Sequence, residues 1–123
     1  MQPPQSRPSL HRGEVWWVRF DPAEGSETSK TRPAVVMTAP GMGRLPLAIV
    51  VPITDWKTHY TQLPWFVHLV PTATNGLRKE SGADGFQVKS LSVDRLRNRL
   101  GLLTPAELDD IAAAVALCVG YAP

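Results

Sequence analysis

Short apolar runs separated by turn residues fill most of the chain. The runs are rich in Val, Ile and aromatic residues, and Gly, Pro and Asp stand between them, which is typical of β-strands joined by turns. Pro52 is expected to end one strand, because proline removes a donor from the ladder. The predicted strands cover residues 14–20, 33–38, 47–51, 65–70, 86–91 and, where a short helical turn is the alternative, 95–100.

The end of the chain follows a helical period instead. Thr104-Pro105-Ala106-Glu107 combines an N-cap residue, a proline at the first helical position and a glutamate three residues after the threonine, which predicts a capping box. Gly120 is expected to end the helix. Apolar residues recur between these points at helical spacing: Leu108, Ile111, Ala112, Val115 and Cys118 or Val119.

The segments between the predicted elements read as turns and loops. A turn is expected over 41–46, a polar loop over 55–62 and a further loop over 71–85. Residues 1–10 are rich in Pro, Gln and Ser, which predicts a flexible tail. We find no internal repeat and predict a single domain over 11–123. The expected fold class is mainly β with a C-terminal α-helix, built as a small, strongly bent barrel or sandwich.

Composition narrows the class of protein without naming a function. The chain has 123 residues and one cysteine, Cys118, so it cannot form an internal disulfide and is expected in a reducing cytoplasm. Its beginning lacks the build of a signal peptide, and no apolar run is long enough to span a bilayer. A net charge of +2 and a pI near 9.0 are compatible with a polyanionic partner.

The polar segment over residues 25–31 leads directly into the apolar run that follows Pro33. Proline fixes its own φ and disfavours helix at the residue before it, so Arg32 is expected to be extended where the loop meets the strand. A guanidinium has five donors in a planar fork, which matches a phosphate. The alternative is an ordinary exposed arginine.

Other residues are weaker candidates. Thr54 places a hydroxyl near the end of a strand, although threonine is also common there for its β-propensity. His59 lies in the polar loop and is a candidate substrate contact, whereas His68 fits a packing role better. No metal-ligand spacing is present. Two further groups are candidates for base stacking and phosphate binding, with packing and solvation as the alternatives: Trp56, Tyr60 and Trp65, and the stripe Arg95, Arg97 and Arg99.

Five blocks of sequence together resemble the MazF/PemK toxins, the ribosome-independent mRNA interferases of bacterial toxin–antitoxin modules. The blocks stand in the order expected for that family, and the resemblance extends from about Arg12 to Gly120. Phe86 stands where members often have an acidic residue, and Ile53 where many have a small or sulfur-bearing one. The blocks are RGEVWWV (12–18), GSE (25–27), KTRPAVV (30–36), VPIT (51–54) and QVKS (87–90).

The resemblance implies an SH3-like (CcdB/PemK-type) β-barrel, a homodimer, and sequence-specific cleavage of single-stranded mRNA without a metal or other cofactor. It also implies a cognate MazE-like antitoxin with a disordered acidic tail. The family's catalytic arginine and threonine fall on Arg32 and Thr54, and its loop glutamate falls on Glu27 near the RNA. We expect RNA contacts from Glu27, Lys30, Trp56, Lys57, His59 and Gln87.

The chemistry that the resemblance implies yields a 2′,3′-cyclic phosphate and a 5′-OH end. RNA supplies its own nucleophile, the 2′-OH, so the protein must align the strand, stabilise charge and move protons. Arg32 is expected to stabilise the phosphoryl charge and Thr54 to hold a phosphoryl oxygen. The proton acceptor stays open between Glu27, a histidine and water, because a guanidinium is almost never neutral at pH 7.

Two other functions are compatible with the same fold. One is a CcdB-like toxin that poisons gyrase, although such toxins end in Trp-Gly-Ile and this chain ends in Val119-Gly120-Tyr121-Ala122-Pro123. The other is a non-catalytic module that binds RNA or an antitoxin.

Overall fold

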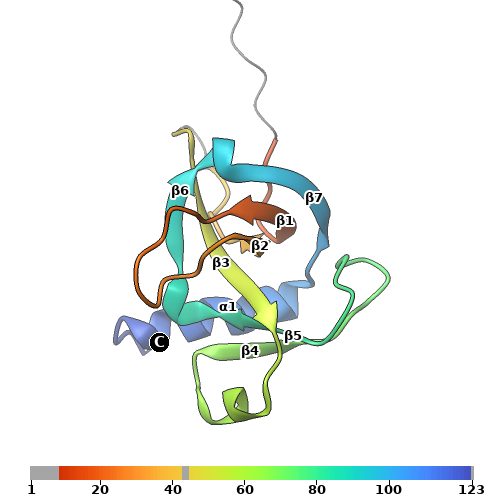
Figure 1. Ribbon diagram of the computed structural model, residues 1–123, viewed down its shortest axis with the longest axis vertical. Helices are drawn as coiled ribbons and strands as arrows, with labels where there is room; N and C mark the ends of the chain where they lie inside the picture. The colour runs from red at the N-terminus through yellow and green to blue at the C-terminus, as the bar shows by residue number, and fades with distance from the viewer. Residues whose placement is uncertain (1–8, 43–44, 123) are drawn as a thin grey trace, which may run out of the picture.

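The computed structural model describes residues 9–42 and 45–122 and forms a twisted antiparallel sheet with one α-helix against it (Figure 1). Most of the predicted tail over 1–10, and Gly43 and Arg44 in the predicted turn over 41–46, lie outside the described residues. In chain order the elements are β1 (Glu14–Arg19), β2 (Thr31–Val36), β3 (Leu47–Asp55), η1 (Thr58–Gln62), β4 (Phe66–Leu69), β5 (Ser81–Asp84), η2 (Gly85–Gln87), β6 (Lys89–Ser92), η3 (Val93–Arg95), β7 (Leu96–Leu102) and α1 (Pro105–Cys118).

The strands follow the order β4-β5-β3-β2-β1-β7, and β6 pairs with β3. All of these pairs are antiparallel. The prediction of a mainly β fold with a C-terminal helix is confirmed. No pairing joins β4 to β7 within the described part of the chain, so the sheet is open there and a closed barrel stays a prediction.

Strand β3 is longer than the sequence suggested, because it continues through Pro52 to Asp55. The carbonyl of Ile49 accepts from the N–H of Met37 on the β2 side, and the N–H of Ile49 donates to Thr38 on that side too. Because backbone groups alternate between the two edges of a strand, the nitrogen of Pro52 faces the opposite edge. That edge has no ladder partner at Pro52, so the missing donor breaks no pair there.

The gap opposite Pro52 is made by η2. Thr54 pairs with Gly82, but Val50 pairs with Lys89, so four steps along β3 are matched by seven steps along the other chain. The three extra residues correspond to the length of η2. Two predictions were therefore wrong. The loop expected over 71–85 contains β5, and the strand expected over 86–91 begins as a 3₁₀ turn and becomes extended only at β6.

The strand expected over 95–100 is present as β7, but the arginine stripe is not. Arg95 lies in η3 and donates to the backbone carbonyls of Arg19 and Asp21 at 3.0 and 2.7 Å. Nε of Arg99 lies 3.0 Å from the carboxylate of Glu14, which is buried at 8% exposure. Irregular pairing of β1 with β7 breaks the alternation on which the stripe depended.

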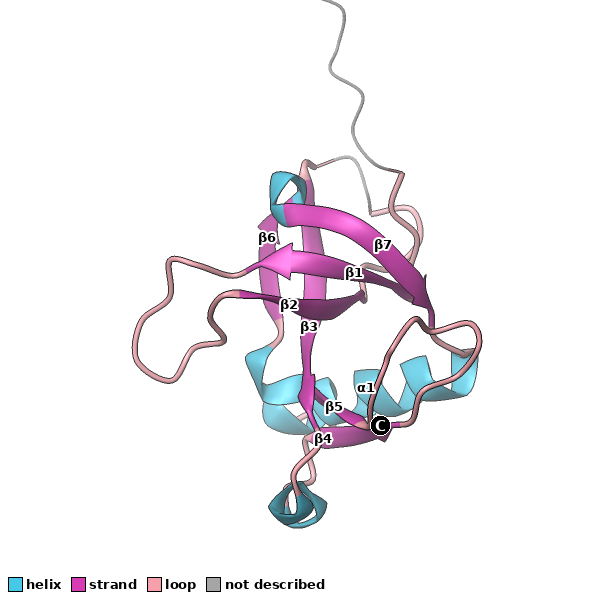
Figure 2. Ribbon diagram, turned by 45° about the vertical axis from the view of Figure 1, so that its right-hand side comes forward, coloured by secondary structure: helices cyan, strands magenta, loops and turns pink. Residues whose placement is uncertain are grey.

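The C-terminal helix forms as predicted. Thr104 and Glu107 make a reciprocal capping box, and Pro105 occupies the first turn. Leu108 and Ile111 are buried in the core cluster that also contains Val35, Val51 and Ile53. The helix packs against β4 and η2, at the end of the molecule where β4 and β5 lie, below β1 and β2 in Figure 2. Within residues 9–42 and 45–122, no helix has the length and apolar character needed to cross a membrane.

Candidate active site

A cavity of about 220 Å³ lies between the β1–β2 loop, the C-terminal half of β3 and the β5–η2 junction. It brings together segments far apart in sequence, and the β1–β2 loop that forms one wall projects from the sheet in Figure 2. Four of the predicted site residues line it: Glu27, Arg32, Thr54 and Gln87. The remaining lining residues are Ser26, Thr28, Ser29, Pro52, Tyr60, Phe66 and Asp84.

Strand register explains why the floor of the cavity carries these side chains. Thr54 pairs with Gly82, and Phe66 pairs with Asp84. Residues opposite each other in a sheet share a face, as do residues two apart along a strand. Thr54, Phe66 and Asp84 therefore lie on one face, while Ile53 and Ala83 between them are turned into the core.

Arg32 enters the cavity from the second position of β2, as expected from Pro33. Its Nε donates to the carbonyl of Ser29 at 2.9 Å, which fixes the side chain against its own loop. Within the described residues, neither terminal nitrogen of this guanidinium has a hydrogen-bond acceptor or a carboxylate partner. The fork is thus held by one edge and offers its other donors to an anion.

Two hydrogen bonds with Gln87 hold the β1–β2 loop, in addition to the turn within the loop. Gln87 Oε1 accepts from the N–H of Thr28 at 2.9 Å, and Gln87 Nε2 donates to the carbonyl of Ser26 at 2.8 Å. Glu27 closes a turn within the loop, since its Oε1 accepts from the N–H of Glu24 at 2.7 Å. Gln87 therefore positions the loop that carries Arg32.

Asp84 is a carboxylate on the floor of the cavity that sequence reasoning did not select. It caps η2, because Oδ1 accepts from the N–H of Phe86 at 3.1 Å. Burial raises the pKa of the Asp84 carboxyl, against the opposite effect of the N–H groups of Phe86 and Gln87. The only sequence signal was its position before a glycine, which is typical of a turn.

Aromatic rings cover the same sheet face next to the cavity. The ring of Tyr60 stacks on Phe66 with centroids 3.8 Å apart, and that of Trp56 stacks on His68 at 4.2 Å. His59 contacts Tyr60 edge to face at 4.8 Å. Tyr60 and Phe66 line the cavity, so the rings form a continuous surface beside it. We call Trp56, His59, Tyr60, Phe66 and His68 the aromatic cluster.

The structure separates the remaining predicted residues from the cavity. Lys30, Trp56, Lys57 and His59 do not line it. Lys30 instead has a backbone role, because its φ of 66° is left-handed and turns the chain into β2. No group of three or more His, Cys, Asp or Glu side chains placed to hold a metal ion is found in the described ranges.

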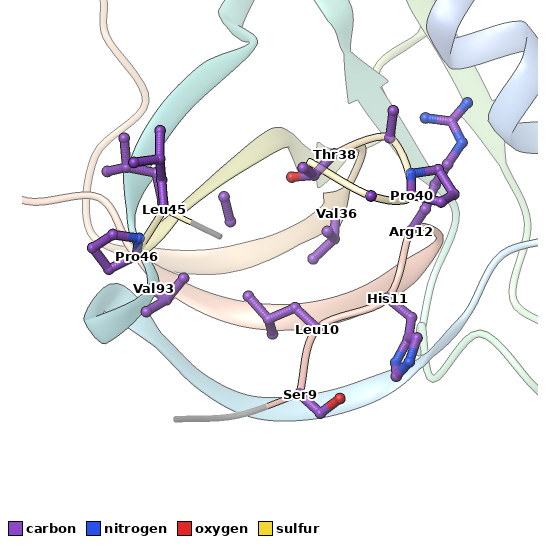
Figure 3. A pocket seen from close by; sticks show the side chains of 14 residues that line it. Ser9, Leu10, His11, Arg12, Val36, Thr38, Pro40, Leu45, Pro46 and Val93 are labelled. Atoms are coloured by element: carbon purple, nitrogen blue, oxygen red, sulfur yellow. The ribbon is translucent and has the colours of Figure 1, made fainter. Parts of the chain in front are cut away.

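A larger cavity of about 670 Å³ lies at the opposite end of β3 (Figure 3). Its lining is largely apolar and includes Leu10, Val36, Leu47 and Val93. Arg12 also lines it, but Nη1 of that residue donates to the carbonyl of Met37 at 2.7 Å. None of the predicted site residues belongs to this cavity.

The fold and the smaller cavity define a small β protein in which a guanidinium fork and a hydroxyl line one cavity. The model of the PemK-like, MazF-like toxins of type II toxin–antitoxin systems matches residues 11–119, and the chain belongs to this family.

Curated relatives agree with this membership. The chain is 35% identical over 115 residues to endoribonuclease MazF9 of Mycobacterium tuberculosis, covering 88% of this chain and 94% of that protein. It is 33% identical over 111 residues to the endoribonuclease toxin MazF of Escherichia coli K12, covering 88% and 92%.

Solved structures share the fold. MazF from Deinococcus radiodurans (Form-I) superposes with a TM-score of 0.75 at 22% identity, covering 95% of this chain and 100% of that one. An endoribonuclease in complex with its cognate antitoxin, from Mycobacterial species, gives a TM-score of 0.72 at 18% identity, covering 94% and 99%. At such identities the likeness concerns the fold alone.

Proposed function

We propose that this protein is an endoribonuclease toxin that cuts single-stranded mRNA at specific sequences and thereby arrests translation and growth. The observation that carries the proposal is the cavity in which the unpaired fork of Arg32 and the hydroxyl of Thr54 face the same space. The names of the curated relatives support the reaction class. As mRNA is the proposed substrate, the proposed site of action is the cytoplasm.

The proposed reaction is attack of a 2′-OH on the adjacent phosphorus, which leaves a 2′,3′-cyclic phosphate and a 5′-OH. The terminal nitrogens of Arg32 stabilise the charge that grows on the phosphoryl oxygens, and Thr54 donates to one of those oxygens. A preorganised charged donor such as Arg32 typically contributes ~2.7–4 kcal/mol, or roughly 10²–10³ in rate. The nucleophile belongs to the substrate, so the proposal needs no metal.

The proposed RNA path crosses the cavity and the aromatic cluster. Bases stack on the aromatic cluster beside the cavity, which gives Trp56 and His59 their role. Glu27 and Gln87 line the cavity and contact the nucleotides at the cut. Lys30 and Lys57 are exposed and attract the flanking phosphates.

The proposed assembly is a homodimer controlled by a MazE-like antitoxin. Leu47 and Ile49 on β3 are 44% and 40% exposed, which supplies apolar surface for a second copy. A disordered acidic tail of the antitoxin is proposed to occupy the RNA path, where it competes for the same basic residues. Light scattering at micromolar concentration tests the dimer, since a monomer mass contradicts it.

The decisive experiment uses one long single-stranded RNA incubated with the purified protein in EDTA. Discrete cuts with cyclic phosphate ends support the proposal. A strand with one 2′-deoxynucleotide on the 5′ side of the cut is expected to survive, and so is the same sequence in a duplex. Cleavage of the substituted strand overturns the nucleophile assignment, and loss of activity in EDTA overturns metal independence.

The same assay separates the two alternative functions. Binding of RNA without cuts supports a non-catalytic module. Intact RNA together with inhibited supercoiling by gyrase supports a CcdB-like toxin.

A further inference from the structure

Four ionisable side chains line the cavity, and they differ in the hydrogen bonds that they already make. These are Glu27, Arg32, Tyr60 and Asp84. No histidine lines the cavity. A reaction that removes a proton from a hydroxyl near neutral pH needs an acceptor within hydrogen-bond reach, which leaves the two carboxylates as candidates.

The carboxylate of Glu27 already stabilises a turn in its own loop. One oxygen of its carboxylate accepts from the N–H of Glu24, and the N–H of Glu27 donates to the carbonyl of Glu24. The side chain is exposed to solvent. Movement of Glu27 toward a substrate would open the turn that it closes.

Asp84, on the floor of the cavity, is held more firmly. It ends β5 and begins η2, so strand pairing with Phe66 and capping of Phe86 fix its backbone and one carboxylate oxygen. It is half-buried and shares the sheet face with Thr54. Among the described residues, no basic nitrogen lies within 4.0 Å of the Asp84 carboxylate, so its charge is not neutralised by an ion pair.

We infer that Asp84 is the group that accepts the proton of the attacking 2′-hydroxyl, an inference that rests on the proposed endoribonuclease function. The Asp84 carboxylate takes the proton as the 2′ oxygen forms its bond to phosphorus. The bond from phosphorus to the 5′ oxygen breaks, and that oxygen takes a proton from water. Asp84 then returns its proton to solvent, and the cyclic phosphate leaves.

The surroundings of Asp84 suit this role. Arg32 on β2 brings positive charge, Glu27 in the β1–β2 loop brings negative charge, and Tyr60 on η1 places its hydroxyl-bearing ring beside them. On α1, burial and the charge of Asp84 both raise the pKa of Cys118, so that thiol stays neutral beside it. Burial raises the pKa of the Asp84 carboxyl above its ordinary value. A carboxylate with a raised pKa is a better proton acceptor once it is ionised.

The variant that tests the inference is Asp84→Asn. Asparagine keeps a side-chain oxygen to cap η2 but cannot accept a proton near neutral pH. Asp94→Asn is the matched control, because Asp94 is an exposed carboxylate within another 3₁₀ turn, η3, near the other end of β3. Melting temperature and binding of an RNA blocked by one 2′-deoxynucleotide are measured for both variants and are expected to match wild type.

The expected kinetic result is a loss of about 10²–10⁴ in kcat/KM for Asp84→Asn and none for Asp94→Asn. Wild-type kcat/KM is expected to rise with pH and then level off once Asp84 is ionised. Asp84→Asn is expected to rise in proportion to hydroxide with no such plateau. Glu27→Gln is expected to keep the plateau, whatever it does to KM.

A substrate with sulfur in place of the bridging 5′ oxygen separates base from acid. Its leaving group needs no proton, so it does not rescue Asp84→Asn if Asp84 takes the 2′ proton. Rescue by this substrate, an unchanged plateau, or a loss explained by weaker binding or a lower melting temperature overturns the inference. Failure of wild-type protein to cut RNA at all refutes the proposed function instead.

Discussion

The two ends of β3 carry two cavities that contrast in size and in chemistry. At the N-terminal end of β3, most of the residues around a cavity of about 670 Å³ are apolar. At the C-terminal end, charged and hydroxyl-bearing residues make up most of the lining of a cavity of about 220 Å³, together with Pro52 and Phe66. The change follows the pairing of the strand, since β6 pairs with the first end and β5 with the second. The short helix η2 lies between β5 and β6, and its Gln87 lines the smaller cavity together with Asp84 at the end of β5.

Among the described residues, one arginine lines each cavity, and the two arginines differ in which of their donors are already used. Arg12 gives a terminal nitrogen to the carbonyl of Met37, while Arg32 gives only Nε to Ser29. A phosphate is bound best by the outer edge of the guanidinium, which is free in Arg32 among the described residues. A site for an anion is therefore marked by unused donors rather than by volume.

Of the variants that test this contrast, Arg32→Ala is expected to lose the most RNA cleavage. Cleavage should fall by roughly 10²–10³ or more, because the change removes a preorganised cation from the cavity. Growth inhibition should be lost with it. The measurement is kcat/KM on a defined RNA, with circular dichroism to show that the fold is unchanged.

Two control variants sharpen the result. Arg12→Ala removes the arginine of the larger cavity and should keep cleavage, although stability falls because Met37 loses a donor. Arg97→Ala removes an exposed arginine on β7 and should change neither. Equal losses for Arg12→Ala and Arg32→Ala would mean that the two ends do not differ in function.

A smaller effect is expected for Gln87→Ala, which cuts the two hydrogen bonds that hold the β1–β2 loop. Each bond contributes about 0.5–1.5 kcal/mol, so cleavage should fall about tenfold as Arg32 loses its support. Hydrogen exchange at the N–H of Thr28 should accelerate while exchange in α1 does not change. Wild-type protection at Thr28 would show that the loop is held by other contacts.

Thr54→Val should have a still smaller effect, about two- to tenfold on kcat, because it removes one neutral hydrogen bond. Valine keeps the β-branched shape that suits β3, so stability should stay close to wild type. The check is kcat and KM measured separately on one RNA. A loss as large as that of Arg32→Ala would assign Thr54 a greater part in the chemistry.

The sequence was sufficient for elements whose signals are local. The capping box at Thr104 and Glu107 forms as predicted, since its residues contact each other within one turn. Arg32 is extended at the start of β2 because Pro33 restricts it directly. The placement of Arg32 and Thr54 in one cavity agrees with the family resemblance, which carried information about distant contacts that no local pattern contains.

What the sequence did not predict depends on pairing between distant segments. Pro52 ends a strand by local rules, but it is tolerated in β3 because the opposite edge is interrupted by η2. β5 was missed because Gly82 and Asp84 disfavour strands, yet Gly82 is needed there beneath two aromatic rings. Asp84 was not selected from the sequence, because no local pattern indicates that its turn borders the cavity.

The smallest expected effect concerns that glycine. A Cβ on Gly82 would lie 3.0 Å from Cδ1 of Phe66 and 3.1 Å from Cε3 of Trp56. Both rings are stacked from another side, by Tyr60 and His68, so neither moves away freely. We expect Gly82→Ala to lower the free energy of unfolding by about 1 kcal/mol, a modest case of overpacking.

Thermal unfolding measures this cost, as a fall in melting temperature of about 2–8 °C. Repeating the change in a Phe66→Leu background tests its cause, because removing one ring leaves room for the added methyl group and the cost should shrink. Cleavage by Gly82→Ala should fall only slightly, since Gly82 does not line the cavity. A Gly82→Ala protein as stable as wild type would show that the aromatic cluster is loosely packed. It would then be better suited to adapting to different bases than to presenting one fixed stacking surface.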